Sequence, residues 1–182
     1  MLIVLLAACP PAQDRVPVFT DSAVDVCDSP RTERVAAVID GDTIDLEGGE
    51  RIRLLGIDTP EVHNVDAVEC FGAEASDELK DLLPEGSEVR LTFDTECVDS
   101  TDSGRTLAYV TTVPEAVDTA VEDPEDAIFV NEHMLERGFA RLPENCAFIA
   151  GLIHEDALRR AADRAKEDGS GLRGACESKN EC

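Results

Sequence analysis

The chain has 182 residues, a length that suits one domain with extensions. Hydrophobic residues make up 43% of it but aromatic residues only 4%, so its core must be built mainly from Leu, Ile, Val and Ala. The 16 Lys and Arg stand against 40 Asp and Glu, and the resulting net charge of −24 opposes nucleic-acid binding through diffuse electrostatic attraction.

The chain begins with an apolar segment, residues 1–8, which precedes Cys9. Leu6-Ala7-Ala8-Cys9 matches the pattern that is cleaved before a lipid-modified cysteine in bacterial lipoproteins. The segment is too short to span a bilayer as a helix, and it lacks the positive charges that begin a signal peptide. We interpret it as a truncated lipoprotein signal, with Cys9 as the lipidation site; a chance match is the alternative.

The region after Cys9, residues 9–33, contains several prolines and shows no helix or strand period. It is predicted to be a tether rather than a second domain. β-branched residues separated by turn residues then predict a meander of strands. The expected strands are residues 35–39, 43–46, 51–57, 88–93 and 106–112, with a short return strand at 128–130.

Helices are predicted at residues 73–83 and 149–168, where apolar residues recur with helical spacing. A further helix is predicted at residues 131–137, where Asn131 can cap a helix that Gly138 closes. An acidic run, residues 113–127, shows neither period and is predicted to be a solvated insertion loop, with a functional lid as the alternative. Five strands and about three helices are typical of an α+β protein built on a five-stranded OB-type β-barrel.

The cysteines indicate an oxidising compartment. Without Cys9, six of the seven remain, an even number that is typical of disulfide-bonded exported proteins. They show no zinc-ligand spacing. The expected location is therefore outside the cytoplasm, as a cell-envelope lipoprotein or a secreted protein. The six are Cys27, Cys70, Cys97, Cys146, Cys176 and Cys182.

The stretch that carries chemistry is residues 39–61, IDGDTIDLEGGERIRLLGIDTPE. A Gly-Gly reversal predicts a hairpin, which brings Asp40 and Asp42 toward Asp58 at one end. Convergent carboxylates suit a hard cation such as Ca²⁺ better than zinc, and Arg53 supplies a fork that matches phosphate. Turn formation alone explains Asp40-Gly41 but not the other residues.

Three segments resemble the active-site segments of the staphylococcal nuclease (thermonuclease) family. They are D-G-D-T at 40–43, R-L-L-x-I-D-T-P-E at 53–61 and G-R-x-L-A-Y at 104–109. F-G-x-E-A at 71–75 and V-N-x-x-M-L-x-x-G-x-A at 130–140 extend the likeness. The resemblance implies the same barrel fold and a nuclease domain over residues 34–175, followed by a tail, residues 176–182.

The resemblance also implies a metal site. Asp42 and Asp58 would give carboxylate ligands to Ca²⁺ and Thr59 its backbone carbonyl, while Asp40 would lie just behind them. In the resembling fold, Cys70 and Cys97 would lie on loops that flank this site. The resemblance therefore predicts that these two cysteines form a disulfide.

The catalytic residues implied by the resemblance are Arg53, Glu61 and Arg105. Glu61 would be the general base for the attacking water, and the two arginines would hold the phosphate. The reaction would be endonucleolytic hydrolysis of the P–O5′ bond in DNA or RNA, which leaves 3′-phosphate ends. One departure is Ser103, which stands before G-R where the family often carries aromatic and basic residues and which cannot stack on a base.

Two functions from different classes follow. The first is a monomeric, calcium-dependent nuclease that is secreted or reaches the membrane only through a lipid at Cys9. The second is a non-catalytic OB-type module that binds a protein or an oligosaccharide. The complete set of charged site residues favours the nuclease.

Overall fold

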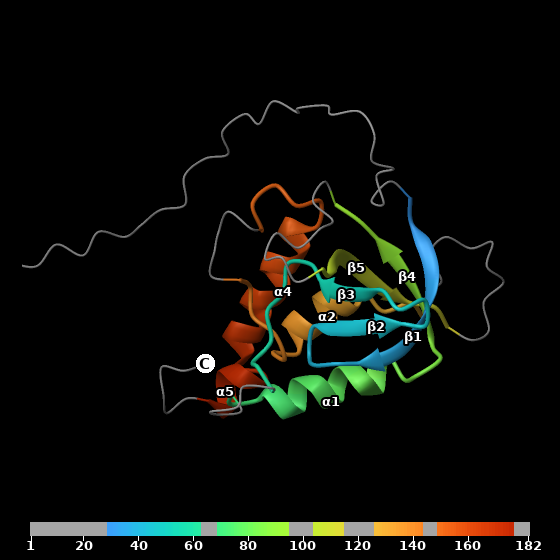
Figure 1. Ribbon diagram of the computed structural model, residues 1–182. Coiled ribbons are helices and arrows are strands. Elements are labelled where there is room, and N and C mark those ends of the chain that lie inside the picture. The colour runs from blue at the N-terminus through green and yellow to red at the C-terminus, as the bar shows by residue number, and fades with distance from the viewer. Residues whose placement is uncertain (1–28, 63–68, 95–103, 115–125, 144–148, 177–182) are drawn as a thin grey trace, which may run out of the picture.

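The structure is a computed structural model that describes residues 29–62, 69–94, 104–114, 126–143 and 149–176. The predicted signal, Cys9, Cys97, Ser103 and the middle of the acidic insertion lie outside the described residues. Five strands form a closed barrel, and the helices lie against one side and one end of it (Figure 1). Among the described residues, no helix is long and apolar enough to cross a membrane.

The barrel closes in the order β1-β2-β3-β5-β4, with β4 returning to β1. Only β3 and β5 pair in parallel; the other neighbours are antiparallel. A parallel pair requires a crossover, and here the chain between β3 and β5 passes through α1 and β4. The barrel confirms the predicted fold class. Its strands are β1 (Arg31–Val38), β2 (Thr43–Leu46), β3 (Arg51–Leu54), β4 (Glu88–Thr92) and β5 (Thr106–Thr112).

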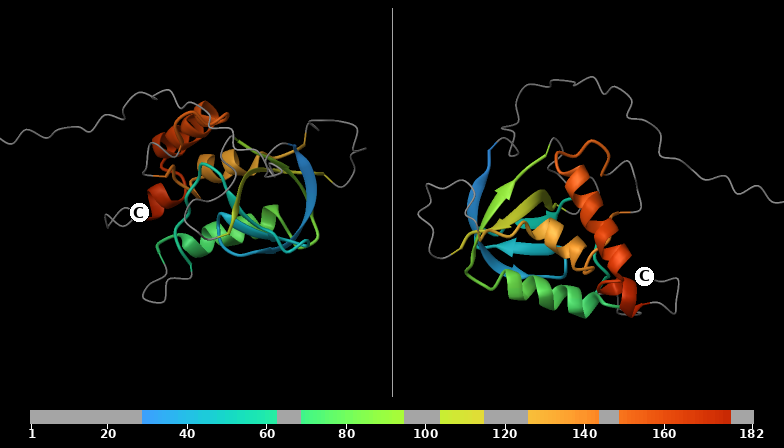
Figure 2. Two further views of the ribbon diagram at one scale, coloured as in Figure 1. Left: turned by 45° about the horizontal axis from the view of Figure 1, so that its top comes forward. Right: turned by 180° about the vertical axis from the view of Figure 1, so that it is seen from behind.

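The described part of the chain contains three longer helices and one short helix outside the barrel. Helix α1 runs beneath the barrel, and α2 and α4 lie together on its flank (Figure 2). The short helix, α5, follows α4 and lies near the start of α1 (Figure 1). The helices are α1 (Gly72–Leu82), α2 (Val130–Glu136), α4 (Glu155–Asp168) and α5 (Leu172–Ala175).

Several element boundaries differ from the sequence-based predictions. β1 begins at Arg31, so three residues predicted as tether pair in the barrel. α4 begins at Glu155 rather than at residue 149, because Gly151 takes a left-handed φ of 85°. The predicted return strand is reduced to an isolated bridge between Phe129 and Thr111.

The core is aliphatic, as the composition predicts, and among the described residues Tyr109 is the one aromatic residue that is fully buried in it. One buried polar residue, Asn131, ties three elements together. Its Oδ1 accepts from the Val110 N–H at 2.9 Å, and its Nδ2 donates to the Leu55 carbonyl at 2.9 Å. These bonds fix α2 against β5 and against the segment after β3, which leads into the candidate site.

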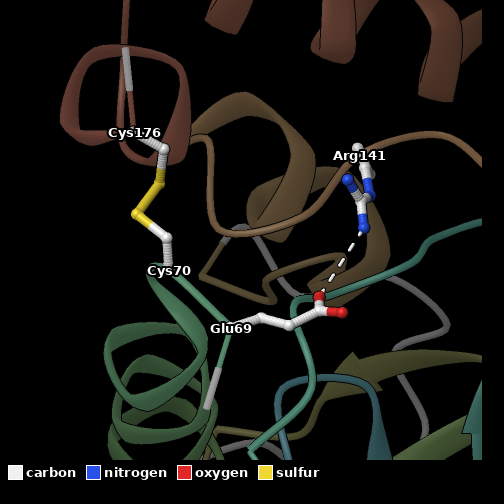
Figure 3. Close-up of a disulfide and its surroundings, with 4 residues drawn as sticks. All are labelled: Glu69, Cys70, Arg141 and Cys176. Carbon is white, nitrogen blue, oxygen red and sulfur yellow. Dashed lines mark ion pairs between the residues drawn. A yellow bond between two sulfur atoms is a disulfide. The ribbon is translucent and has the colours of Figure 1, made fainter. Parts of the chain in front are cut away.

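The predicted disulfide between Cys70 and Cys97 is wrong, because Cys70 is bonded to Cys176 (Figure 3). The two Cα atoms are 6.2 Å apart although 106 residues separate them in the chain. The Leu172 N–H donates to the Gly138 carbonyl at 2.9 Å, and this bond holds α5 against the end of α2. Cys176 is thereby carried to the start of α1.

Candidate active site

The turn between β1 and β2 sets the position of Asp42. The Asp40 carboxylate accepts the Asp42 N–H at 3.0 Å, an aspartate-stabilised turn, and the Ile39 N–H closes the turn on the Thr43 carbonyl at 2.9 Å. Asp42 therefore enters the barrel end as a buried residue, with a side chain that is only 7% exposed. Asp40 holds this turn and remains half-exposed.

Thr59 supplies most of the hydrogen bonds to the buried carboxylate. Its N–H and hydroxyl donate to Asp42 Oδ2 at 2.8 and 2.9 Å, and the Thr43 hydroxyl donates to Oδ1 at 3.1 Å. Gly41 makes this contact possible, because a Cβ at position 41 would lie 2.8 Å from Thr59 Oγ1. The glycine between the two aspartates is thus required by the close approach of Thr59.

Arg53 joins the two predicted metal-ligand carboxylates. One guanidinium nitrogen, Nη1, lies 3.0 Å from Asp42 Oδ2, and the other, Nη2, lies 3.1 Å from Asp58 Oδ1. Nη1 also donates to the Ile57 carbonyl at 2.9 Å, so the same side chain holds the bend that follows β3. The hairpin register explains this geometry, because Arg53 stands directly opposite Thr43, the residue after Asp42.

Asp58 is held by a second arginine that the sequence did not indicate. The backbones of Asp58 and Arg141 exchange two hydrogen bonds, at 2.9 and 2.8 Å. Arg141 Nε also approaches Asp58 Oδ2 at 3.4 Å. The Asp58 side chain is 38% exposed, so this carboxylate remains open to solvent on one side.

Burial dominates the electrostatics of Asp42. Desolvation raises its pKa to about 7, and the nearby Asp40 adds to the rise. Arg53 and the hydrogen bonds from Thr59 lower the pKa, but they do not offset the burial. A cation beside Asp42 would favour its charged form, so this carboxyl group is suited to hold one.

The donor set fits a hard cation. Two carboxylates, those of Asp42 and Asp58, converge on one guanidinium, and the backbone of Thr59 directly follows Asp58 in the chain. Within the described ranges, no three Asp, Glu, His or Cys side chains gather as a metal cluster. A cation here would therefore rely on the two carboxylates together with carbonyl and water oxygens, a combination that Ca²⁺ accepts.

Glu61, the predicted general base, lies at the exposed edge of the site. Its N–H donates to Glu69 Oε2 at 3.2 Å, and its carbonyl accepts from the Glu69 N–H at 3.0 Å. Its backbone, rather than its carboxylate, makes these contacts. The exposed carboxylate is available to a water molecule.

Arg105 immediately precedes β5, after Gly104 with a left-handed φ of 67°. In the parallel pairing of β3 and β5, Arg53 stands opposite Leu107, two residues after Arg105. Arg105 therefore lies just before the part of β5 that pairs with Arg53. The structure thus places both predicted phosphate-binding residues on neighbouring segments.

Two residues at this site, Arg141 and Glu69, were not predicted from the sequence. Arg141 follows the V-N-x-x-M-L-x-x-G-x-A segment by one position, and Glu69 precedes F-G-x-E-A by two. Their positions next to these recognisable segments were the one sequence feature that could have indicated them as site residues. Neither residue belongs to a pattern that by itself predicts a contact.

Comparison with known proteins gives three relevant relatives. A thermonuclease of Staphylococcus intermedius is 48% identical over 80 residues, which are 42% of this chain and 46% of the relative. Endonuclease YhcR of Bacillus subtilis is 34% identical over 151 residues, 76% of this chain but 11% of the relative. An uncharacterized protein of Methanocaldococcus jannaschii is 28% identical over 159 residues, 76% of this chain and 70% of the relative.

The chain thus spans less than half the length of the thermonuclease and a small part of the endonuclease. The family model described as "Staphylococcal nuclease homologue" matches residues 51–173, from β3 to α5. This range includes Arg53, Asp58, Glu61 and Arg105. Asp42 lies before the range, directly ahead of β2, which pairs with β3 inside it. With the closed five-stranded barrel and its covering helices, the chain belongs to the family of staphylococcal nuclease homologues.

Proposed function

We propose that this protein is a calcium-dependent nuclease that hydrolyses phosphodiester bonds of DNA, RNA or both. The observation that carries the proposal is the convergence of Asp42 and Asp58 on the guanidinium of Arg53. A buried carboxylate, a solvent-facing carboxylate and a phosphate-matching fork at one point suit a site for a cation and a phosphate. The names of two relatives, a thermonuclease and an endonuclease, support the same chemistry.

Asp42, Asp58 and the Thr59 carbonyl would hold Ca²⁺, while Asp40 keeps the turn that presents Asp42. When bound, the ion would polarise the phosphate and neutralise part of its charge. Asp42 is prepared for this role by its rigid setting, because Thr59 and Thr43 already fix both of its oxygens. Little reorganisation of this carboxylate is then needed on binding.

Arg53 and Arg105 would bind the phosphate and stabilise the charge that gathers on it in the transition state. The Arg53 donors that now contact Asp42 and Asp58 are the ones that a phosphate oxygen would take. Glu61 would accept the proton from the attacking water. Cleavage of the P–O5′ bond would then leave a 3′-phosphate and a 5′-hydroxyl.

Incubation of the purified protein with plasmid DNA and with RNA tests the proposal. We expect cleavage in Ca²⁺ and none after chelation, with products that accept a 5′ label from a kinase without prior phosphatase treatment. Absence of cleavage in Ca²⁺ would refute the nuclease and leave the binding module. Cleavage that survives the chelator would refute the calcium dependence alone.

The compartment is a separate proposal. We propose that the protein is exported and acts as a monomer on extracellular nucleic acid. The Cys70–Cys176 disulfide supports an oxidising environment, where such bonds persist. Thiol titration of the protein isolated without reductant and then denatured should find no free thiol among the six cysteines after Cys9. Six titratable thiols would contradict export.

A further inference from the structure

One residue, Glu69, contacts both backbone groups of Glu61. The Glu69 N–H donates to the Glu61 carbonyl at 3.0 Å, and Glu69 Oε2 accepts the Glu61 N–H at 3.2 Å. Two reciprocal bonds between one pair of residues restrict rotation of the Glu61 backbone from both sides. The direction in which the Glu61 side chain leaves the chain is therefore set by Glu69.

The same Glu69 carboxylate also faces Arg141 (Figure 3). Arg141 Nη2 lies 3.8 Å from Glu69 Oε2, and Arg141 Nε lies 3.4 Å from Asp58 Oδ2. Arg141 is itself fixed by its two backbone bonds to Asp58. Glu69 thus connects the segment of the proposed base to the segment of a proposed metal ligand.

The chain that follows Glu69 is held firmly. Cys70 is bonded to Cys176, which follows α5, so the residue next to Glu69 is anchored to a segment 106 residues away along the chain (Figure 3). Phe71 adopts a left-handed φ of 71°, which a non-glycine residue keeps only where its surroundings impose it. Its ring stacks on Phe139 with centroids 5.6 Å apart.

Gly72 completes this contact surface. A Cβ at Gly72 would lie 2.9 Å from the Pro60 carbonyl and 3.1 Å from the Glu61 carbonyl. The backbone of Gly72 therefore packs directly on the segment that carries Glu61. Residues 69–72 form a rigid support for Glu61, with the disulfide at its centre.

We propose that Glu69 is a positioning residue for Glu61, and that the Cys70–Cys176 disulfide holds Glu69 in that role. The inference rests on the proposed nuclease function. A general base must lie within hydrogen-bond reach of its water, and small displacements of a reacting group are costly in rate. Glu61 is exposed and needs an external support, which Glu69 provides.

Three substitutions at position 69 separate the contributions of the acceptor oxygen, the charge and the length of the Glu69 side chain. Glu69→Gln keeps an oxygen that can accept the Glu61 N–H, whereas Glu69→Ala removes it. Glu69→Asp keeps the charge but shortens the reach by one methylene. We expect kcat to fall about tenfold or more in the Ala and Asp variants and to stay near wild type in the Gln variant. KM should change little, because Glu69 contacts Glu61 and Arg141, and neither is a proposed phosphate-binding residue.

The matched control is Glu74→Ala, which removes an exposed glutamate from the first turn of α1, five positions along the chain. The disulfide is tested by the double variant Cys70→Ser/Cys176→Ser, assayed well below its melting temperature. We expect a lower kcat with little change in KM, as for Glu69→Ala. A disulfide with a purely structural role would lower the melting temperature and leave both kcat and KM near their wild-type values.

Amide hydrogen exchange gives a readout that needs neither metal nor substrate. The Glu61 amide should exchange about tenfold or more faster in Glu69→Ala and in the double-Ser variant than in wild type, and at the wild-type rate in Glu69→Gln. Wild-type protein that fails to cleave in Ca²⁺ refutes the proposed function, and the exchange rates still decide whether Glu69 holds Glu61. Wild-type kcat and wild-type Glu61 exchange in Glu69→Ala and Glu69→Asp would overturn the role of Glu69. The same result in the double-Ser variant would overturn the role of the disulfide.

Discussion

The Arg53 guanidinium lies 3.0 Å from the buried carboxylate of Asp42, so a permanent cation already occupies the end of the barrel where a metal ion is expected. Arg53 is itself only 16% exposed, and Asp42 is 7% exposed at its side chain. Removal of the Asp42 carboxylate would take one ion-pair partner from the buried Arg53 guanidinium. Removal of Arg53 would favour the protonated, neutral form of Asp42. Substitutions here must therefore be chosen to keep the shape of the site.

Asp42→Asn keeps the shape and removes the charge. We expect Ca²⁺ affinity, measured by calorimetry, to fall by more than about tenfold, because a carboxylate ligand is lost. The melting temperature should change little, because the Asn oxygen can still accept from Thr59 and burial opposes the charged form of Asp42. Asp45→Asn is the control, since Asp45 pairs with Arg51 on the outside of the hairpin. Unchanged Ca²⁺ affinity in Asp42→Asn would contradict the ligand assignment.

Gly41→Ala tests the close approach that builds the site. The new methyl group would lie 2.8 Å from Thr59 Oγ1 and 2.9 Å from the Ala75 Cβ, so Thr59 must move away from Asp42. We expect a loss of about 1–3 kcal/mol in the free energy of unfolding, measured in urea, together with weaker Ca²⁺ binding. Gly48→Ala is the control, because a Cβ there meets no heavy atom within 4 Å. Equal stability of the two variants would show that the packing around Gly41 is not limiting.

Glu61→Gln and Arg105→Ala should each lower kcat by about 10²-fold or more, because each removes a charged contact to the transition state. Circular dichroism should remain that of the wild type, since Glu61 is exposed and Arg105 precedes β5 rather than lying within it. Glu74→Gln and Arg159→Ala, on the exposed sides of α1 and α4, are the matched controls. A folded variant at either position with near wild-type turnover would remove that residue from the mechanism.

Tyr109 gives the stability of the fold a distinctive dependence on alkaline pH. Burial raises the pKa of Tyr109, and its hydrogen bond to Asp94, at 2.8 Å, raises the pKa further. The unfolded chain loses the phenol proton near pH 10 while the native state keeps it, so this stabilisation is complete below about pH 10 and is lost above it. The slope should approach about 1.4 kcal/mol per pH unit.

The chain contains one Tyr and no Trp, so the absorbance band of tyrosinate reports Tyr109 alone. We expect no tyrosinate signal from the native protein until it unfolds. Tyr109→Phe should lower the free energy of unfolding by about 1 kcal/mol or more and flatten its decline with pH. A tyrosinate signal near pH 10 in folded protein would contradict the buried setting.

Salt should affect the proposed nuclease activity differently from the binding of a basic nucleic-acid-binding protein. A net charge of −24 repels a polyanion, and salt screens that repulsion over about 10 Å at about 0.1 M. We expect kcat/KM on long DNA, at saturating Ca²⁺, to rise or stay level from low to moderate NaCl. A dinucleotide substrate should show much less dependence. A steep fall for long DNA from the lowest salt would mean that the local arginines outweigh the net charge.

Much of the fold could be predicted from sequence because its signals are local. β2 and β5 lie where alternation and turn residues predict them, and the Gly48-Gly49 reversal sets the register that places Thr43 opposite Arg53. That single hairpin brings Asp42 and Arg53 together, and Asp58 lies only five residues after Arg53. The predicted boundaries were wrong where a single glycine changes the backbone, as Gly151 does before α4.

Tertiary structure alone decided what surrounds these residues. Asp58 meets Arg141 across 83 residues of chain, and Cys70 meets Cys176 across 106. Such contacts depend on how α2 packs on the barrel and how α5 lies against the end of α2, and one sequence carries no periodic signal for that arrangement. The depth of Asp42 is set in the same way, because Thr59 and Ala75, from segments after β3 and within α1, close over Gly41. Burial, and with it the raised pKa of Asp42, arises only when those separate segments meet.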